Sequence, residues 1–113
     1  MPHISTGRPS LADYAPVFAA LGDATRLTLL DRLGGGKSLS IARLGAGLGL
    51  TRQGVTRHLD VLERADLVAS ERVGRESHYA VKVEVLRPAL DHLARASAQW
   101  DAAADRLRAF VED

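Results

Sequence analysis

The sequence predicts a mainly α-helical fold with one small β-hairpin. Residues 40–62 carry apolar side chains at the spacing of two short helices that pack together. Residues 67–73 and 77–82 have the composition of two short strands joined by a turn, and residues 86–111 repeat an apolar side chain every three or four positions. This order of helices and strands predicts a winged helix-turn-helix with a terminal helix at about 85–112. All of these elements belong to one domain over residues 11–113. A flexible lead of residues 1–10 precedes it.

Composition limits the classes of protein to consider. A chain of 113 residues with 46% hydrophobic and 26% charged side chains fits one globular domain. Cysteine is absent, which excludes disulfides and thiolate metal sites. The first ten residues are polar and no run of 18 apolar residues occurs, so we expect a cytoplasmic protein without a membrane partner. The formal net charge is +1 for the whole chain and +2 over residues 37–78. Because this charge is small, the geometry of the predicted motifs, rather than the bulk charge, indicates the binding partner.

Two helices are predicted before the helix-turn-helix. Residues 11–21 form the first, and its apolar side serves core or dimer packing through Leu11, Tyr14 and Phe18. Asp23 caps the second, residues 24–33, which ends at three glycines. Its inward-facing side chains are expected to be Leu27, Leu30 and Leu33.

The helix-turn-helix segment carries the chemistry that points to DNA. Gly45 allows the two helices to cross closely, Gly49 supplies the positive φ of a tight turn, and Thr51 caps the second helix. The expected buried positions are Leu44, Leu48, Leu50, Val55 and Leu59. The exposed face then carries Arg52, Gln53, Thr56 and Arg57. These side-chain types hydrogen-bond to base edges in the major groove. The alternative is an ordinary helix pair whose charges are only solvated.

The hairpin that follows is interpreted as a wing. Its strands are linked through Gly74, Arg75 and Glu76, and Arg72 and Arg75 lie at or near the tip. There they can reach a phosphate or a narrow minor groove. The alternative is a solvated hairpin whose charges protect an exposed edge.

The terminal helix carries a heptad stripe of about four repeats. The stripe comprises Leu86, Leu90, Leu93, Ser97, Trp100, Ala104, Leu107 and Val111. Pro88 lies in the first turn, where its missing N–H costs little. The stripe predicts a homodimer, and its large members join Leu11, Tyr14 and Phe18 in the expected interface. Packing of the stripe on the first helix of the same chain remains an alternative.

These segments together resemble the ArsR family (ArsR/SmtB type) of bacterial winged-helix regulators. The resemblance rests on DATRLTLLDRL, LGLTRQGVTRHLDVLERADLV and GRESHYAV, and it spans nearly the whole chain. It implies a dimeric repressor that binds double-stranded DNA at an inverted repeat in a promoter, usually its own, and releases it when a signal arrives. No nucleophile elbow or equivalent context supports a catalytic group, so we expect neither enzymatic activity nor a cofactor. The residues expected to contact DNA are Lys37, Ser40, Thr51, Arg52, Gln53, Thr56, Arg57, His58, Arg72 and Arg75. Ala24 and Gly54 depart from the family's pattern, and Gly54 costs a helix about 1 kcal/mol relative to alanine.

The family usually senses a metal, and here the sequence departs from it. The terminal helix offers Asp91, His92, Asp101 and Asp105 as ligands. Asp91 and His92 are adjacent, so their side chains diverge by about 100° and do not chelate together. We therefore expect no metal site. The alternatives are a repressor that responds to a metal or small molecule at an unrecognised site and a winged-helix module that binds protein. A hydrolase is a third alternative and the least favoured.

Overall fold

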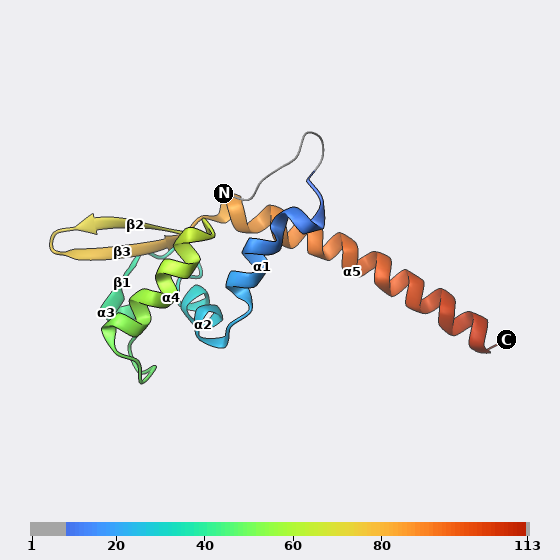
Figure 1. The fold of residues 1–113 in the computed structure, drawn as a ribbon, viewed down its shortest axis with the longest axis horizontal. Helices are drawn as coiled ribbons and strands as arrows, with labels where there is room; N and C mark the ends of the chain where they lie inside the picture. The colour runs from blue at the N-terminus through green and yellow to red at the C-terminus, as the bar shows by residue number, and fades with distance from the viewer. Residues whose placement is uncertain (1–8, 113) are drawn as a thin grey trace.

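The structure, a computed structural model, describes residues 9–112 (Figure 1). The elements follow in the order 3₁₀ helix η1 (Leu11–Tyr14), helices α1 (Ala15–Leu21) and α2 (Ala24–Arg32), strand β1 (Leu39–Ser40), helices α3 (Ile41–Leu44) and α4 (Arg52–Arg64), strands β2 (Val68–Val73) and β3 (Glu76–Val81), and helix α5 (Val83–Glu112). This order confirms the predicted mainly helical winged helix-turn-helix with a hairpin.

The first predicted helix is divided into η1 and α1. Ser10 begins η1 in a capping box, because its backbone N–H donates to Asp13 Oδ2 at 2.8 Å. Pro16 lies in the first turn of α1, where a missing N–H is tolerated. Ser10 therefore belongs to the folded body rather than to the predicted lead, whose residues 1–8 lie outside the described residues.

Helix α2 has the predicted cap and a different buried face. Asp23 Oδ2 accepts the backbone N–H of Arg26 at 3.0 Å. Leu33 is buried as predicted, but Leu29 is also buried and Leu27 is 50% exposed. The expected inward position of Leu27 is wrong, because two residues of helix rotate it about 200° from Leu29.

The connection between α3 and α4 is longer than one tight turn. Helix α3 has only four residues, and Gly47 and Gly49 both adopt positive φ in the segment before Thr51. Gly45 allows the predicted close crossing, since a Cβ there would lie 2.6 Å from Val55 Cγ2. Of the predicted buried positions, Leu44, Val55 and Leu59 are buried and Leu48 is half-buried. Leu50 is exposed, because it precedes the cap and lies outside the helix.

The hairpin forms a three-stranded antiparallel sheet in the order β1-β3-β2. Val73 pairs with Glu76, so the turn is Gly74 and Arg75 alone, and Gly74 has the positive φ that such a hairpin requires. The third strand, β1, was not predicted. Its two residues are too few to show an alternating pattern, and they pair with Tyr79 and His78 of β3.

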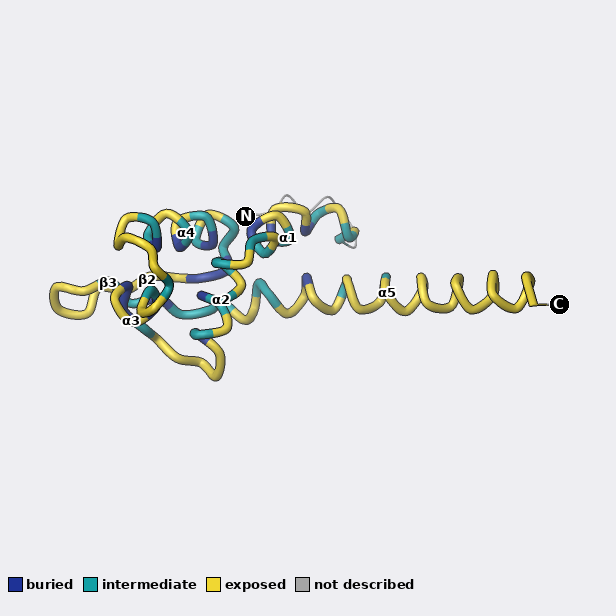
Figure 2. The backbone as a smooth tube through the Cα atoms, turned by 90° about the horizontal axis from the view of Figure 1, so that it is seen from below, coloured by how far each residue is buried: buried dark blue, intermediate teal, exposed yellow. Residues whose placement is uncertain are grey.

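Helix α5 starts on the body and then leaves it (Figure 2). Ala89 is fully buried, Val85 and Leu86 pack against the core, and Tyr14 contacts His92 edge-on with ring centroids 5.0 Å apart. Packing within the chain therefore accounts for the start of the helix. Tyr14 is itself buried within the chain, and its expected place in the dimer interface stays a prediction. No helix within residues 9–112 is long and apolar enough to cross a membrane.

The large apolar side chains farther along α5 are exposed: Leu90, Leu93, Trp100, Leu107, Phe110 and Val111. Their exposed fractions rise from 37% at Leu93 to 80% at Phe110. Isolated apolar side chains are common on protein surfaces, but a continuous stripe of them indicates an interaction surface.

Substitution of Gly45 by alanine tests the close packing of α3 on α4. Val55 is buried and β-branched, so it has little freedom to move away from a new Cβ. We expect Gly45→Ala to lower the free energy of unfolding by about 1 to 3 kcal/mol, measured by urea denaturation at fixed protein concentration. Gly22→Ala is the matched control, since its Cβ would meet neighbours only at 3.5 Å. Equal stability of the two variants would contradict the packing.

Candidate nucleic-acid interface

One exposed face of α4 gathers the predicted base-contacting side chains. Thr51 Oγ1 accepts the backbone N–H of Gly54 at 3.0 Å, as predicted, and the helix runs without interruption through Gly54. The face forms a shallow hollow of about 480 Å³, lined by Arg52, Gln53, Thr56, Arg57 and Asp60. These positions recur at helical spacing, which places them on one side of α4.

The groups on this face suit the major groove of DNA. Arginine forms two hydrogen bonds to guanine and glutamine forms two to adenine. Thr56 donates its hydroxyl proton to the Arg52 carbonyl at 2.9 Å, so it offers a methyl group and an acceptor oxygen to a base. Asp60 was not predicted, although its position four residues after Thr56 puts it on the same face. Its carboxylate can accept the amino group of cytosine.

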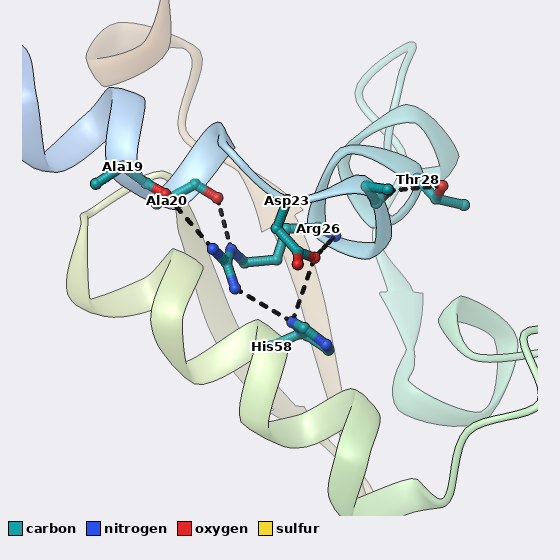
Figure 3. A network of polar contacts seen from close by, with 7 residues as sticks. Ala19, Ala20, Asp23, Arg26, Thr28 and His58 are labelled. Atoms are coloured by element: carbon teal, nitrogen blue, oxygen red, sulfur yellow. Dashed lines mark hydrogen bonds and ion pairs between the residues drawn. The ribbon is translucent and has the colours of Figure 1, made fainter.

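Two residues of the predicted contact set lie apart from this face. Ser40 is only 6% exposed, and its hydroxyl accepts the backbone N–H of Arg43 at 3.3 Å to cap α3. His58 faces α2, where its Nδ1 lies 3.3 Å from Arg26 Nη1 and 3.7 Å from Asp23 Oδ2 (Figure 3). Both side chains contact other residues of the body and do not lie on the exposed face of α4 that carries Arg57.

Arg26 joins three helices at this point (Figure 3). Its Nε donates to the Ala20 carbonyl at 2.6 Å and its Nη2 to the Ala19 carbonyl at 3.4 Å, at the end of α1. Its Nη1 contacts His58 on α4. The backbone N–H of Arg26 also lowers the pKa of Asp23 below its ordinary value of 3.8, an effect that burial opposes and that the charges of Arg26 and His58 reinforce. The network fixes α4 relative to α1 and α2.

A second arginine of α2 fixes the other end of the helix-turn-helix. Arg32 Nη1 donates to the Leu44 carbonyl at 2.8 Å and to the Ala46 carbonyl at 2.6 Å. These carbonyls end α3 and begin the connecting segment, where a helix leaves acceptors unpaired. The sequence showed no sign of this role, because an arginine at the end of α2 also fits a solvated position.

The wing and Lys37 add exposed positive charge. Lys37 lies before β1, and Arg72 and Arg75 lie at the tip of the hairpin beside Glu71 and Glu76, all exposed. Figure 1 shows the wing tip and the start of α4 on the same side of the body, away from α5. The fold therefore places the wing tip and the start of α4 at the same end of the molecule.

The possible metal ligands on α5 do not gather. Within residues 9–112 no group of three or more His, Asp or Glu side chains is placed to hold an ion. His92 contacts Tyr14, and its Nδ1 lies 2.9 Å from Arg95 Nη2. A larger open hollow of about 860 Å³ lies beside it, lined by Pro9, Tyr14, Val83, Glu84, Arg87, Pro88, Asp91, His92 and Arg95.

Known proteins share both the sequence and the fold. Residues 21–71 match the family described as a helix-turn-helix domain. The chain is 42% identical over 65 residues to the uncharacterized HTH-type transcriptional regulator YuzN of Bacillus subtilis. The aligned region covers 52% of this chain and 71% of YuzN. It is 35% identical to the structure of an ArsR-like transcriptional regulator from Rhodococcus sp. RHA1, with a TM-score of 0.68 over 88% of this chain and 92% of that one. The chain belongs to the ArsR family of winged helix-turn-helix regulators.

A further relative is the transcriptional repressor SdpR of Bacillus subtilis. It is 27% identical over 75 residues, which cover 66% of this chain and 82% of SdpR. Members of the ArsR family are DNA-binding transcription regulators and not enzymes. The chain therefore belongs to a family of DNA-binding transcription regulators, and DNA is the general class of partner that the comparisons support.

Substitutions at Asp23 test the cap that anchors α2. We expect Asp23→Ala to lower the urea midpoint at pH 7, whereas Asp23→Asn keeps an acceptor oxygen and most of the stability. Because the folded-state pKa of Asp23 is depressed, its charge stabilises the fold above pH 3.8 and ceases to do so as pH falls through the lower folded pKa. The difference between the wild type and Asp23→Ala should therefore shrink below pH 3.8. A difference independent of pH would show that the carboxylate charge contributes nothing.

Proposed function

We propose that this ArsR-family protein is a homodimeric repressor that binds an inverted-repeat operator in a promoter, including its own. The observation that carries the proposal is the exposed face of α4. Arg52, Gln53, Thr56 and Arg57 point outward there, while Val55 and Leu59 hold the helix on the core. The relative named as a repressor, SdpR, supports repression as the outcome of binding.

The proposed complex places α4 in a major groove. The backbone N–H groups at the start of α4 and the side chain of Lys37 would contact phosphates and set the register. The wing would place Arg75 and Arg72 at the adjacent backbone or minor groove. Arg52, Gln53, Thr56 and Arg57 would then contact base edges. We omit Ser40 and His58 from this set, because their side chains are engaged inside the body.

The exposed stripe of α5 supports the dimer. An inverted repeat is bound by two equivalent recognition helices about one turn of DNA apart, which a two-fold symmetric pair provides. Leu90, Leu93, Trp100, Leu107 and Val111 supply an apolar surface for such a pair outside the body. In this proposal, bound protein represses by excluding polymerase from the promoter.

Fluorescence anisotropy at physiological salt tests the function directly. The duplex is the region immediately upstream of the coding sequence, and a scrambled duplex of the same composition is the control. We expect at least thousandfold tighter binding to the upstream duplex, as specific operators show over non-specific DNA. Equal weak binding to both duplexes would overturn autoregulation.

Arg57→Ala tests the base-contacting face. Loss of a bidentate contact to guanine should weaken operator binding by about 1 to 3 kcal/mol at fixed salt. Arg106→Ala removes an exposed arginine from α5, far from this face, and should leave affinity unchanged. If Arg57→Ala also binds as the wild type does, Arg57 is not among the base-contacting residues.

A further inference from the structure

The exposed face of α4 carries one acidic side chain beside its basic and amide groups. Asp60 is exposed and lines the same shallow hollow as Arg52, Gln53, Thr56 and Arg57. We propose that Asp60 selects a cytosine in each half of the operator and excludes the other bases from that position. This inference rests on the proposed function and names the residue that discriminates at one base pair.

Within residues 9–112 the carboxylate of Asp60 has no hydrogen-bond or ion-pair partner. Arg57 lies three residues before it and Arg64 four residues after it, at the spacing where side chains of a helix meet. Neither arginine forms an ion pair with Asp60, and Arg64 donates to its backbone carbonyl at 3.4 Å. Substitution of Asp60 therefore removes no side-chain contact that holds the fold together.

A carboxylate on a surface that binds DNA carries a cost. The phosphates are negatively charged, so Asp60 opposes the attraction of Arg52 and Arg57 for any duplex. Like charges that meet across an interface disfavour the complexes in which they meet. Asp60 therefore weakens binding to DNA in general, and a base that donates a hydrogen bond to the carboxylate offsets this cost.

The major-groove edges of the four bases identify that base as cytosine. Guanine presents two acceptors, and thymine presents an acceptor and a methyl group. Adenine has an amino donor, but its N7 acceptor lies beside the donor and repels a carboxylate. Cytosine presents an amino donor with no acceptor on its own edge, so it satisfies Asp60 without repulsion.

The position of Asp60 on α4 indicates which part of the operator it contacts. Asp60 follows Arg57 by three residues, so the two lie on the same face, about 4.5 Å apart along the helix axis. Successive base pairs are about 3.4 Å apart. In a helix that follows the major groove, the two side chains therefore reach the same or neighbouring base pairs. We expect a guanine contacted by Arg57 close to the cytosine contacted by Asp60.

Selection from a library of random DNA duplexes tests the base preference without knowledge of the operator. The full-length wild type, Asp60→Ala and Asp60→Asn each bind the library at physiological salt, and the bound duplexes are sequenced. We expect the wild type to enrich a motif with one cytosine in each half that Asp60→Ala no longer selects, while the rest of the motif is kept. Asp60→Asn should select adenine there, because asparagine forms two hydrogen bonds to adenine.

Fluorescence anisotropy with two duplexes measures the size of the effect. The first duplex carries the motif that the wild type enriches, and in the second the cytosine–guanine pair is reversed in one half. Reversal places acceptors opposite Asp60, so it should weaken wild-type binding about 5- to 150-fold, the usual effect of one mismatched base pair. The affinity of Asp60→Ala should be nearly the same for both duplexes.

Asp31→Asn is the matched control for the loss of one negative charge. Asp31 is an exposed residue of α2, and its carboxylate likewise has no partner in the part of the chain that the structure describes. The Asp31→Asn and Asp60→Asn proteins have the same net charge. We expect Asp60→Asn, but not Asp31→Asn, to bind a scrambled duplex several-fold more tightly than the wild type, because Asp60 faces the phosphates.

The outcomes separate this inference from the proposed function. A wild type that enriches no sequence would overturn both. A motif shared by the wild type and Asp60→Ala would overturn this inference alone and leave sequence-specific binding intact. Equal loss of affinity by Asp60→Ala for both duplexes would also overturn it, because Asp60 would then position a neighbouring side chain. Equal tightening by Asp31→Asn and Asp60→Asn on the scrambled duplex would reduce the exclusion to an effect of net charge and overturn it.

Discussion

The arrangement of α1, α2 and α4 depends on the contacts of the Arg26 guanidinium. Carbonyl groups at a helix C-terminus lack intrahelical donors and carry partial negative charge. Arg26 supplies donors to Ala19 and Ala20 at the end of α1, while Asp23 caps α2 beside it. The remaining guanidinium nitrogen contacts His58 on α4. One side chain thus joins α1, α2 and α4.

Helix α2 holds the helix-turn-helix in place through contacts at its two ends. Arg26 acts near its start, and Arg32 acts at its end by donating to the carbonyls of Leu44 and Ala46. Between them, Leu29 is fully buried and anchors the helix in the core. The side chains on the exposed face of α4 take no part in these contacts. Exchange of a side chain on this exposed face therefore breaks none of the contacts that hold α4 in place.

The sequence predicted those features that follow from short-range rules. The caps at Asp23 and Thr51, the close approach at Gly45 and the hairpin around Gly74 each depend on neighbouring residues or on one periodic pattern. The exposed face of α4 followed from the positions of Val55 and Leu59.

Features that depend on tertiary contacts could not be predicted in this way. The His58 contact to Arg26 spans 32 positions of the sequence, and β1 exists only because β3 lies beside it.

The connection between the body and the terminal helix also depends on tertiary contacts. Only Lys82 separates β3 from α5. Its backbone N–H donates to the Leu67 carbonyl at 2.8 Å, and its ammonium pairs with Asp66, an interaction that raises the pKa of Lys82 despite partial desolvation. Asp66 follows α4 with a positive φ, so the end of α4, the wing and the start of α5 meet at one short, ion-paired junction. The junction therefore joins the wing and the end of α4 to the start of α5 without a flexible linker between them.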